Sequence, residues 1–150
     1  MKNLIQCGLL LVSVVCGGYL HLQPNYKDRT QVKEAILNYV EGVYEADTTR
    51  IYRSVHPTLV KRGTYFNRQS GKYSEFREIS FKQLVDLTNC WKKDGTGANS
   101  ETIRDLNIYD VQDKTATAKV VAAWGTDYFH LAKIDGKWYI MNVLWQSSKV

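Results

Sequence analysis

The sequence is poor in the residues that carry metal and thiol chemistry. It has only three cysteines and three histidines, and His21, His56 and His130 lie far apart along the chain. No His-x-His, Cys-x-x-Cys or His-Glu-x-x-His spacing occurs, which argues against a zinc site. The glycines within residues 95–97 are not followed by a helix signature, so no phosphate-binding loop is predicted. We therefore expect no metal, no cofactor and no recognisable set of catalytic residues.

Proline and glycine are also scarce. Two prolines and ten glycines among 150 residues exclude collagen-like and low-complexity proteins. Apolar residues make up 44% of the chain and charged residues 23%, as in an ordinary globular protein. With no internal repeat and no linker, this length predicts a single folded domain.

The chain has one apolar run, and it is too short to cross a membrane. It follows Lys2 and extends over residues 4–16, or roughly 20 Å of helix against a bilayer core of about 30 Å. A positive start, a short apolar stretch and small residues at Gly17 and Gly18 are typical of a secretory signal peptide. We expect a signal peptide at residues 1–18, an N-terminal extension at 19–29, and a protein that is periplasmic or secreted. Two alternatives remain: a lipid anchor at Cys16, or a buried N-terminal helix.

Removal of such a signal would leave one cysteine, Cys90. An intrachain disulfide would then be excluded, so the hydrophobic core must hold the fold together. Cys90 falls within a helical pattern and has no neighbouring histidine. We interpret it as a small core residue.

Helical spacing of apolar residues predicts three helices. The first spans residues 30–46 and is preceded by a capping box that starts at Asp28. Asp47 is placed to cap a short second helix, which Pro57 ends. Another capping box, starting at Ser80, opens the third helix.

Extended runs rich in β-branched and aromatic residues predict strands. These runs cover residues 59–66, 72–79, 106–111, 116–124 and 137–145, with one further strand between the last two. Tight turns are expected at Gly125-Thr126 and Asp135-Gly136. Helices followed by a meander indicate an α+β fold, with the helices packed on one face of a curved antiparallel sheet.

The two turns also fix which residues share a face of the sheet. One face is almost entirely apolar and should pack against the helices: it carries Val120, Ala122, Trp124, Phe129, Leu131, Trp138, Ile140 and Leu144. Asp127 and Asn142 are the polar exceptions on that face. We interpret them as the polar end of a ligand pocket with walls formed by Trp124, Phe129, Trp138 and Leu144. The alternative is that Asp127, which follows a turn, simply reaches water.

The opposite face is too apolar for a sheet surface left in water. It carries Val121, Ala123, Tyr128, His130, Ala132, Tyr139, Met141, Val143 and Trp145. Contiguous patches rich in Tyr, Trp and Met usually mark interfaces. We predict a homodimer through this face, the alternative being that a terminus or loop of the same chain covers it.

Three further residues are candidates for the pocket. His56 stands where the second helix ends, either as a titratable group at the pocket edge or as a cap on the helix. Tyr65 and Trp91 are placed either in the pocket wall or in the ordinary core.

Positive charge is concentrated in the middle of the chain. Residues 50–93 contain 10 basic and 3 acidic side chains, whereas the segments on either side are nearly balanced. This pattern predicts a solvated basic face or an anionic partner. A nucleic-acid partner is not expected, because no recognition motif accompanies the charge.

The order of these elements resembles the nuclear transport factor 2-like superfamily, and within it most closely the putative lumazine-binding family. The resemblance is carried by the opening helix (32–44), residues 55–57, the helix after Ser80, and the stretches 127–131 and 135–140. It covers about residues 30–146, nearly all of the predicted mature chain, and implies a domain of this type at residues 30–147. It implies a cone-shaped α+β roll of the cystatin-like kind, a cavity between the helices and the concave sheet, and often a dimer through the sheet face.

The superfamily includes isomerases, dehydratases, polyketide cyclases and noncatalytic binding proteins. Ketosteroid isomerase chemistry needs an aspartate base, and residues 56–61 of this chain, where that base would be expected, contain no carboxylate. We therefore expect an exported, noncatalytic protein that binds a small hydrophobic or aromatic ligand. The alternatives are an enzyme of the same fold, with His56 or Asp127 as the base, and a protein-interaction module without a ligand.

Overall fold

A computed structural model describes residues 26–91, 98–99 and 101–149 of the chain. The predicted signal peptide, most of the predicted extension and most of the loop after the third helix lie outside the described residues. The helices are α1 (Tyr26–Glu45), α2 (Thr48–Ser54) and α3 (Phe81–Cys90). The strands are β1 (Val55–Thr64), β2 (Phe66–Asn67), β3 (Lys72–Tyr73), β4 (Arg77–Ile79), β5 (Arg104–Val111), β6 (Thr115–Ala122), β7 (Gly125–Ile134) and β8 (Lys137–Gln146).

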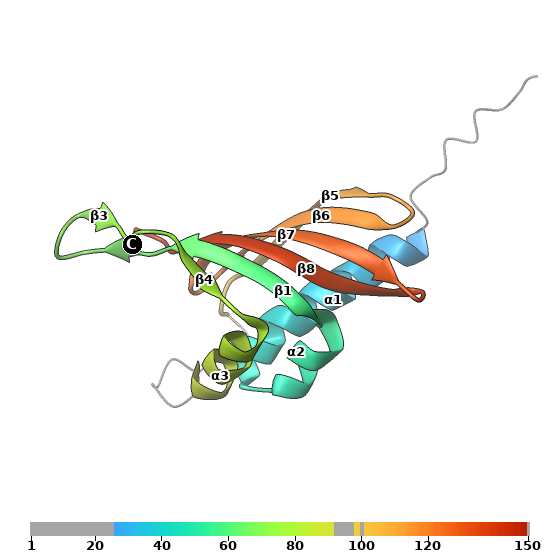
Figure 1. Ribbon diagram of the computed structural model, residues 1–150, viewed down its shortest axis with the longest axis horizontal. Helices are drawn as coiled ribbons and strands as arrows, with labels where there is room; N and C mark the ends of the chain where they lie inside the picture. The colour runs from blue at the N-terminus through green and yellow to red at the C-terminus, as the bar shows by residue number, and fades with distance from the viewer. Residues whose placement is uncertain (1–25, 92–97, 100, 150) are drawn as a thin grey trace, which may run out of the picture.

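The helices cover one face of a curved sheet, which confirms the predicted α+β fold (Figure 1). The main sheet has the strand order β4-β1-β8-β7-β6-β5, and β2 and β3 form a separate hairpin that projects from its edge. The sheet is mixed rather than wholly antiparallel, because β1 lies parallel to β8. No turn connects these two strands, so no local signal in the sequence announces their pairing.

Helix α1 begins before the predicted position and lies along the concave face. Val32, Ile36 and Val40 are fully buried against the sheet. Asp28 is not a cap but a residue of the first turn, and its Oδ1 accepts hydrogen bonds from Lys133 Nζ (2.5 Å) and Trp138 Nε1 (3.0 Å). The tertiary partners of Asp28 therefore replace the capping role that the sequence indicated.

The other two helix starts follow the sequence signals. Asp47 caps α2 by accepting the Thr49 amide at 2.9 Å, and Ser80 opens α3 with a complete capping box. The end of α3 differs from our interpretation, because Cys90 is exposed. Cys90 lies six residues after the buried Leu84, about 240° around the helix at 3.6 residues per turn, and so faces away from the core.

The turn between β6 and β7 lies two residues earlier than predicted. Ala122 pairs with Gly125, so Ala123 and Trp124 form the turn. Gly125 has φ +131°, and a Cβ there would lie 2.2 Å from the backbone oxygen of Gln146. Only glycine fits this backbone conformation and this close approach. A two-residue shift leaves each side chain on its predicted face, and Val120, Ala122, Phe129 and Leu131 are buried as expected.

A bulge in β8 changes the predicted register. Leu131 pairs with Ile140 as expected, but His130 then pairs with Asn142, which leaves Met141 as an extra residue. Beyond a bulge of one residue, every side chain changes face. Val143 is therefore buried and Leu144 is 51% exposed, the reverse of the prediction. Trp145 moves to the concave face and Asn142 to the convex face.

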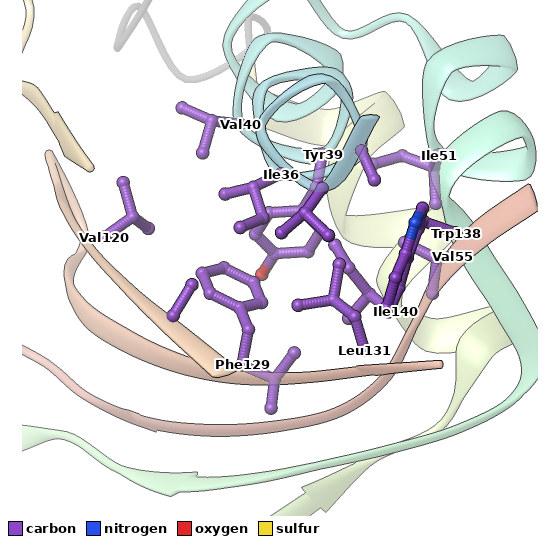
Figure 2. Close-up of a cluster of buried hydrophobic side chains, with 14 of the residues drawn as sticks. Ile36, Tyr39, Val40, Ile51, Val55, Val120, Phe129, Leu131, Trp138 and Ile140 are labelled. Atoms are coloured by element: carbon purple, nitrogen blue, oxygen red, sulfur yellow. The ribbon is translucent and has the colours of Figure 1, made fainter. Parts of the chain in front are cut away.

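The core fills the space between α1 and the sheet (Figure 2). Ile36, Tyr39 and Val40 descend from α1 toward Phe129 and Leu131 of β7, and Ile51, Val55, Val120, Trp138 and Ile140 complete the labelled cluster. Burial of this set of apolar side chains away from water is the main source of the stability of the fold.

Candidate functional site

A cavity of about 140 Å³ lies between α1, α3 and the concave face of the sheet. Its aromatic lining consists of Tyr39, Trp91, Trp124 and Trp145. Its aliphatic lining consists of Val43, Ile79, Leu84 and Leu87. Among the described residues, Lys61 is the one charged side chain in the lining. Apolar walls with few polar groups are the usual composition of a small-molecule site.

Edge-to-face contacts fix the aromatic walls. The ring of Trp124 lies 5.5 Å from that of Trp91 at 86°, and 6.1 Å from that of Tyr39 at 82°. Tyr44 holds the turn that carries Trp124: its hydroxyl accepts the Ala123 amide (2.8 Å) and donates to the Ile103 carbonyl (2.7 Å). Trp124 is therefore positioned by α1 as well as by its own turn.

Asp127 lies at the base of this aromatic group and is completely buried. Its Oδ2 accepts hydrogen bonds from the Tyr39 hydroxyl (2.8 Å) and from Trp124 Nε1 (3.1 Å). Lys61 Nζ is 3.2 Å from both carboxylate oxygens. The alternative in which Asp127 reaches water is wrong, because protein groups engage both of its oxygens.

Lys61 is a site residue that the charge pattern of the sequence does not single out. It falls within the basic stretch of residues 50–93, yet its side chain is only 7% exposed, and its Nζ also donates to the Tyr39 hydroxyl at 2.7 Å. Alternation along β1 puts Lys61 on the same face as Leu59, both buried. That alternation, together with a predicted inward carboxylate in need of a cation, is the signal that could have identified Lys61.

Burial also changes the acidity of the groups around Asp127. It raises the pKa of the Tyr39 hydroxyl well above its usual value, and the adjacent carboxylate adds to that effect. Burial lowers the pKa of the Lys61 ammonium from its usual value, against the opposing influence of Asp127. Tyr39 therefore stays protonated and bridges the two charged groups, accepting from Lys61 and donating to Asp127.

Trp145 contributes an indole with an unused donor. Its Nε1 is buried and has no hydrogen-bond partner among the described residues. The centroid of the ring is 5.6 Å from Lys61 Nζ, which places the indole beside the ion pair. This nitrogen has essentially no exposed area, so the ring of Trp145 and not its N–H forms the wall of the cavity.

Three of the predicted site residues come together at this cavity. Trp124 and Trp91 line it, and Asp127 lies behind its wall, where it accepts a hydrogen bond from Trp124. Phe129 does not line the cavity and packs in the core, 5.4 Å from the ring of Tyr39. Trp138 lies at the other end of α1, where it donates to Asp28.

The remaining predicted residues lie outside the cavity. Asn142, turned to the convex face by the bulge, is 3.3 Å from the His130 ring nitrogen. His56 contacts Thr58 through its Nδ1 (2.7 Å) and lies against the ring of Tyr139. Tyr65 lies at an adjoining depression, where Arg77 is 5.1 Å from its ring. This depression shares Ile79, Leu87 and Trp145 with the cavity. The exposed Leu144 forms no wall of the cavity.

Within the part of the chain that the structure describes, no group of three or more His, Cys, Asp or Glu side chains could hold a metal ion. No helix within residues 26–91, 98–99 and 101–149 is both long and apolar enough to span a bilayer.

The family model described as putative lumazine-binding matches residues 27–146. This chain belongs to the putative lumazine-binding family. The match covers most of the chain and confirms the resemblance drawn from the order of elements and from the closing strands. No curated protein matches the chain.

Solved structures of nuclear transport factor 2-like proteins share the fold of this chain. One is a nuclear transport factor 2-like protein of unknown function from Shewanella baltica OS155, with 18% identity, a TM-score of 0.62, and coverage of 84% of this chain and 98% of that one. Another, from Methylobacillus flagellatus KT, has 23% identity, a TM-score of 0.62, and coverage of 81% and 93%. A ketosteroid isomerase-like protein from Erwinia carotovora atroseptica SCRI1043 has 13% identity, a TM-score of 0.53, and coverage of 81% and 96%. At these identities the likeness shows the shared fold alone.

Proposed function

We propose that this member of the putative lumazine-binding family is an exported, noncatalytic protein that binds a small hydrophobic or aromatic molecule in the cavity of α1, α3 and the sheet. The observation that carries the proposal is the cavity itself. Aromatic and aliphatic side chains form its walls, and a buried Lys61–Asp127 pair bridged by Tyr39 forms its polar base. The family description, putative lumazine-binding, supports a small-molecule ligand.

Binding is better supported than catalysis. A general base must be within reach of the substrate and free to accept a proton. Both oxygens of Asp127 already accept hydrogen bonds from Lys61, and its Oδ2 also accepts from Tyr39 and Trp124. His56 is not among the residues that line the cavity. Neither candidate base therefore suits the enzyme alternative.

The ligand proposal is tested by native mass spectrometry of protein purified without refolding. Leu84 is buried in the cavity wall, and a Leu84→Phe variant should fill part of the empty space. Leu144→Phe, on the exposed convex face, is the matched control. We expect the wild type and the control to carry a small molecule that Leu84→Phe has lost, with circular dichroism showing that all three are folded. A Leu84→Phe protein that retains the same molecule at full occupancy would contradict a site in this cavity.

We also propose that the protein is a homodimer through the convex face of the sheet. Tyr128 and Leu144 are cross-strand partners there, and they are 46% and 51% exposed. His130 is exposed on the same strand as Tyr128, and Tyr139 and Met141 of β8 are half-buried. Trp145, which the sequence pattern placed on this face, is not part of the proposed interface, because it lines the cavity on the other face.

A further inference from the structure

We infer, resting on the proposed function, that the ligand is an amphipathic carboxylate that occupies both the cavity and the depression beside Tyr65 and Arg77. Its apolar part lies in the cavity between α1, α3 and the sheet. Its carboxylate lies in the depression, against the guanidinium of Arg77.

The cavity and the depression adjoin along strand β4. Ile79, Leu87 and Trp145 line both of them. Arg77 is two residues before Ile79 in β4, so both side chains project from the same face of the sheet, with Cα atoms about 7 Å apart. Gly63 pairs with Arg77 on one side and with Trp145 on the other, and its lack of a side chain lets the indole lie against the strand between them. A ligand can therefore extend from the cavity past Trp145 to Arg77.

The wall of the cavity suits only the apolar part of such a ligand. Its exposed surface is almost wholly apolar. Lys61 Nζ is already bound to the Tyr39 hydroxyl and to both oxygens of Asp127, so a charged group of the ligand would lose its hydration there without gaining a partner. An apolar cavity of roughly 150 Å³ holds benzene, and this cavity of about 140 Å³ has room for a ring or a short alkyl chain.

The depression differs from the cavity because charged side chains line it. Two of them are carboxylates with cations of their own: Glu78 Oε2 is 2.9 Å from Arg62 Nη2, and Asp86 Oδ2 is 2.7 Å from Lys82 Nζ. Arg77 has no acidic partner among the described residues. The unmatched charge of the depression is therefore one positive charge, which suits a ligand with one negative charge.

Tyr65 holds the guanidinium of Arg77 and leaves most of its donors unused. The centroid of the Tyr65 ring is 5.1 Å from the guanidinium carbon, and the hydroxyl accepts one long hydrogen bond of 3.5 Å from Arg77 Nη2. The planar fork of an arginine can bind both oxygens of a carboxylate at once. A phosphate monoester would bring a second negative charge, for which no unmatched cation lines the depression among the described residues.

Two probes of equal size test the role of the charge. 5-Phenylpentanoate has a ring for the cavity, a carboxylate for Arg77, and a methylene chain that spans roughly the 7 Å between the two positions. 5-Phenylpentanamide has the same shape and no charge. We expect the full-length protein to bind the carboxylate roughly three- to tenfold more tightly at neutral pH and low salt, as measured by calorimetry. High salt should reduce this preference, because Arg77 is exposed and its charge is screened.

The variant Arg77→Gln removes the proposed partner of the carboxylate. It should bind the two probes with nearly equal affinity and should bind the amide as the wild type does. Arg68→Gln, in the exposed loop between β2 and β3, makes the same change of charge outside both linings and is the matched control. Its preference for the carboxylate should persist. Leu84→Phe, which fills part of the cavity, should weaken binding of both probes to a similar extent. Circular dichroism checks that each variant is folded.

The outcomes separate this inference from the proposed function. Equal affinity of the wild type for the two probes, or tighter binding of the amide, overturns the inference, while binding of both still supports a small-molecule site. A preference for the carboxylate that survives Arg77→Gln also overturns it, as does a Leu84→Phe variant that binds both probes as tightly as the wild type. If neither probe binds, the inference is wrong, and native mass spectrometry of Leu84→Phe alone decides whether the cavity holds a ligand.

Discussion

At the scale of single residues, the main feature of the site is the buried ion pair of Lys61 and Asp127. Each charge is almost fully removed from water, with side-chain exposures of 7% and 0%. A buried charge is tolerated when it is paired and hydrogen-bonded, and Tyr39 and Trp124 supply the remaining contacts of Asp127. The cavity thus acquires polarity without a net charge.

Removal of one partner of this pair should be costly. We predict that Asp127→Asn lowers the free energy of unfolding by about 3–5 kcal/mol, because the Lys61 ammonium is left buried without its counter-charge. The double variant Lys61→Met with Asp127→Asn should recover part of that loss, since neither charge then remains. Urea denaturation at neutral pH measures both. A loss below about 1 kcal/mol in the single variant would be typical of an exposed pair and would contradict the buried arrangement.

At the scale of secondary-structure elements, the pairing of β1 with β8 determines which side chains meet at the site. Lys61 pairs with Val143 and Gly63 with Trp145, so this one parallel pair of strands brings the cation and the unpaired indole to the same face. The approach is close at Gly63, where an added Cβ would lie 2.2 Å from the backbone oxygen of Trp145 and 2.3 Å from its ring. Glycine is required there to allow the indole to lie against the strand.

Substitution of Gly63 should therefore damage both the pairing and the cavity. We predict that Gly63→Ala lowers the free energy of unfolding by about 1–3 kcal/mol, the usual cost of overpacking. Displacement of Trp145, which lines the cavity, should also lower the occupancy of the copurifying ligand. Thermal unfolding and native mass spectrometry measure the two effects. A variant with unchanged stability and unchanged ligand occupancy would show that β1 and β8 do not approach as closely as described.

At the scale of the whole molecule, the space between α1 and the sheet is packed with side chains near the start of the helix and contains the cavity near its end. At the start of the helix, Asp28 binds Lys133 and Trp138 beside the β7–β8 turn, and Ile36 and Val40 pack in the continuous core. Tyr39, about 16 Å along the helix from Asp28 at 1.5 Å per residue, borders the cavity. Both parts of this space lie on the concave face of the sheet, and no helix among the described residues covers its convex face (Figure 1).

Association through the convex face can be tested on the exposed Leu144. We predict that Leu144→Lys raises the dissociation constant of the dimer at least about tenfold, because a charge would replace an apolar contact in the interface. Phe76→Lys, at a residue that is 66% exposed but lies before β4, is the control and should leave the assembly unchanged. Sedimentation velocity measures both variants. A wild type that sediments as a monomer at roughly tens of micromolar would remove the basis for a dimer.

The sequence by itself determined the local features of this protein. The caps at Asp47 and Ser80 and the turn at Asp135-Gly136 all formed where the pattern indicated, because each depends on residues a few positions apart. The fold class and the family followed from the order of such elements. The inward position of Asp127 was also predictable, because the shift of the β6–β7 turn by two residues preserves the face of every side chain.

Only the tertiary structure decided the composition of the site. The bulge at Met141 turns Asn142, Leu144 and Trp145 to the face of the sheet opposite to the predicted one. The sequence of β8 contains no local signal for this bulge. The pairing of Lys61 with Asp127 depends on β1 lying parallel to β8, where Lys61 pairs with Val143, more than eighty residues later in the chain. Contacts over such a separation depend on the whole packed molecule, so local periodicity could place one charge inside but could not identify its partner.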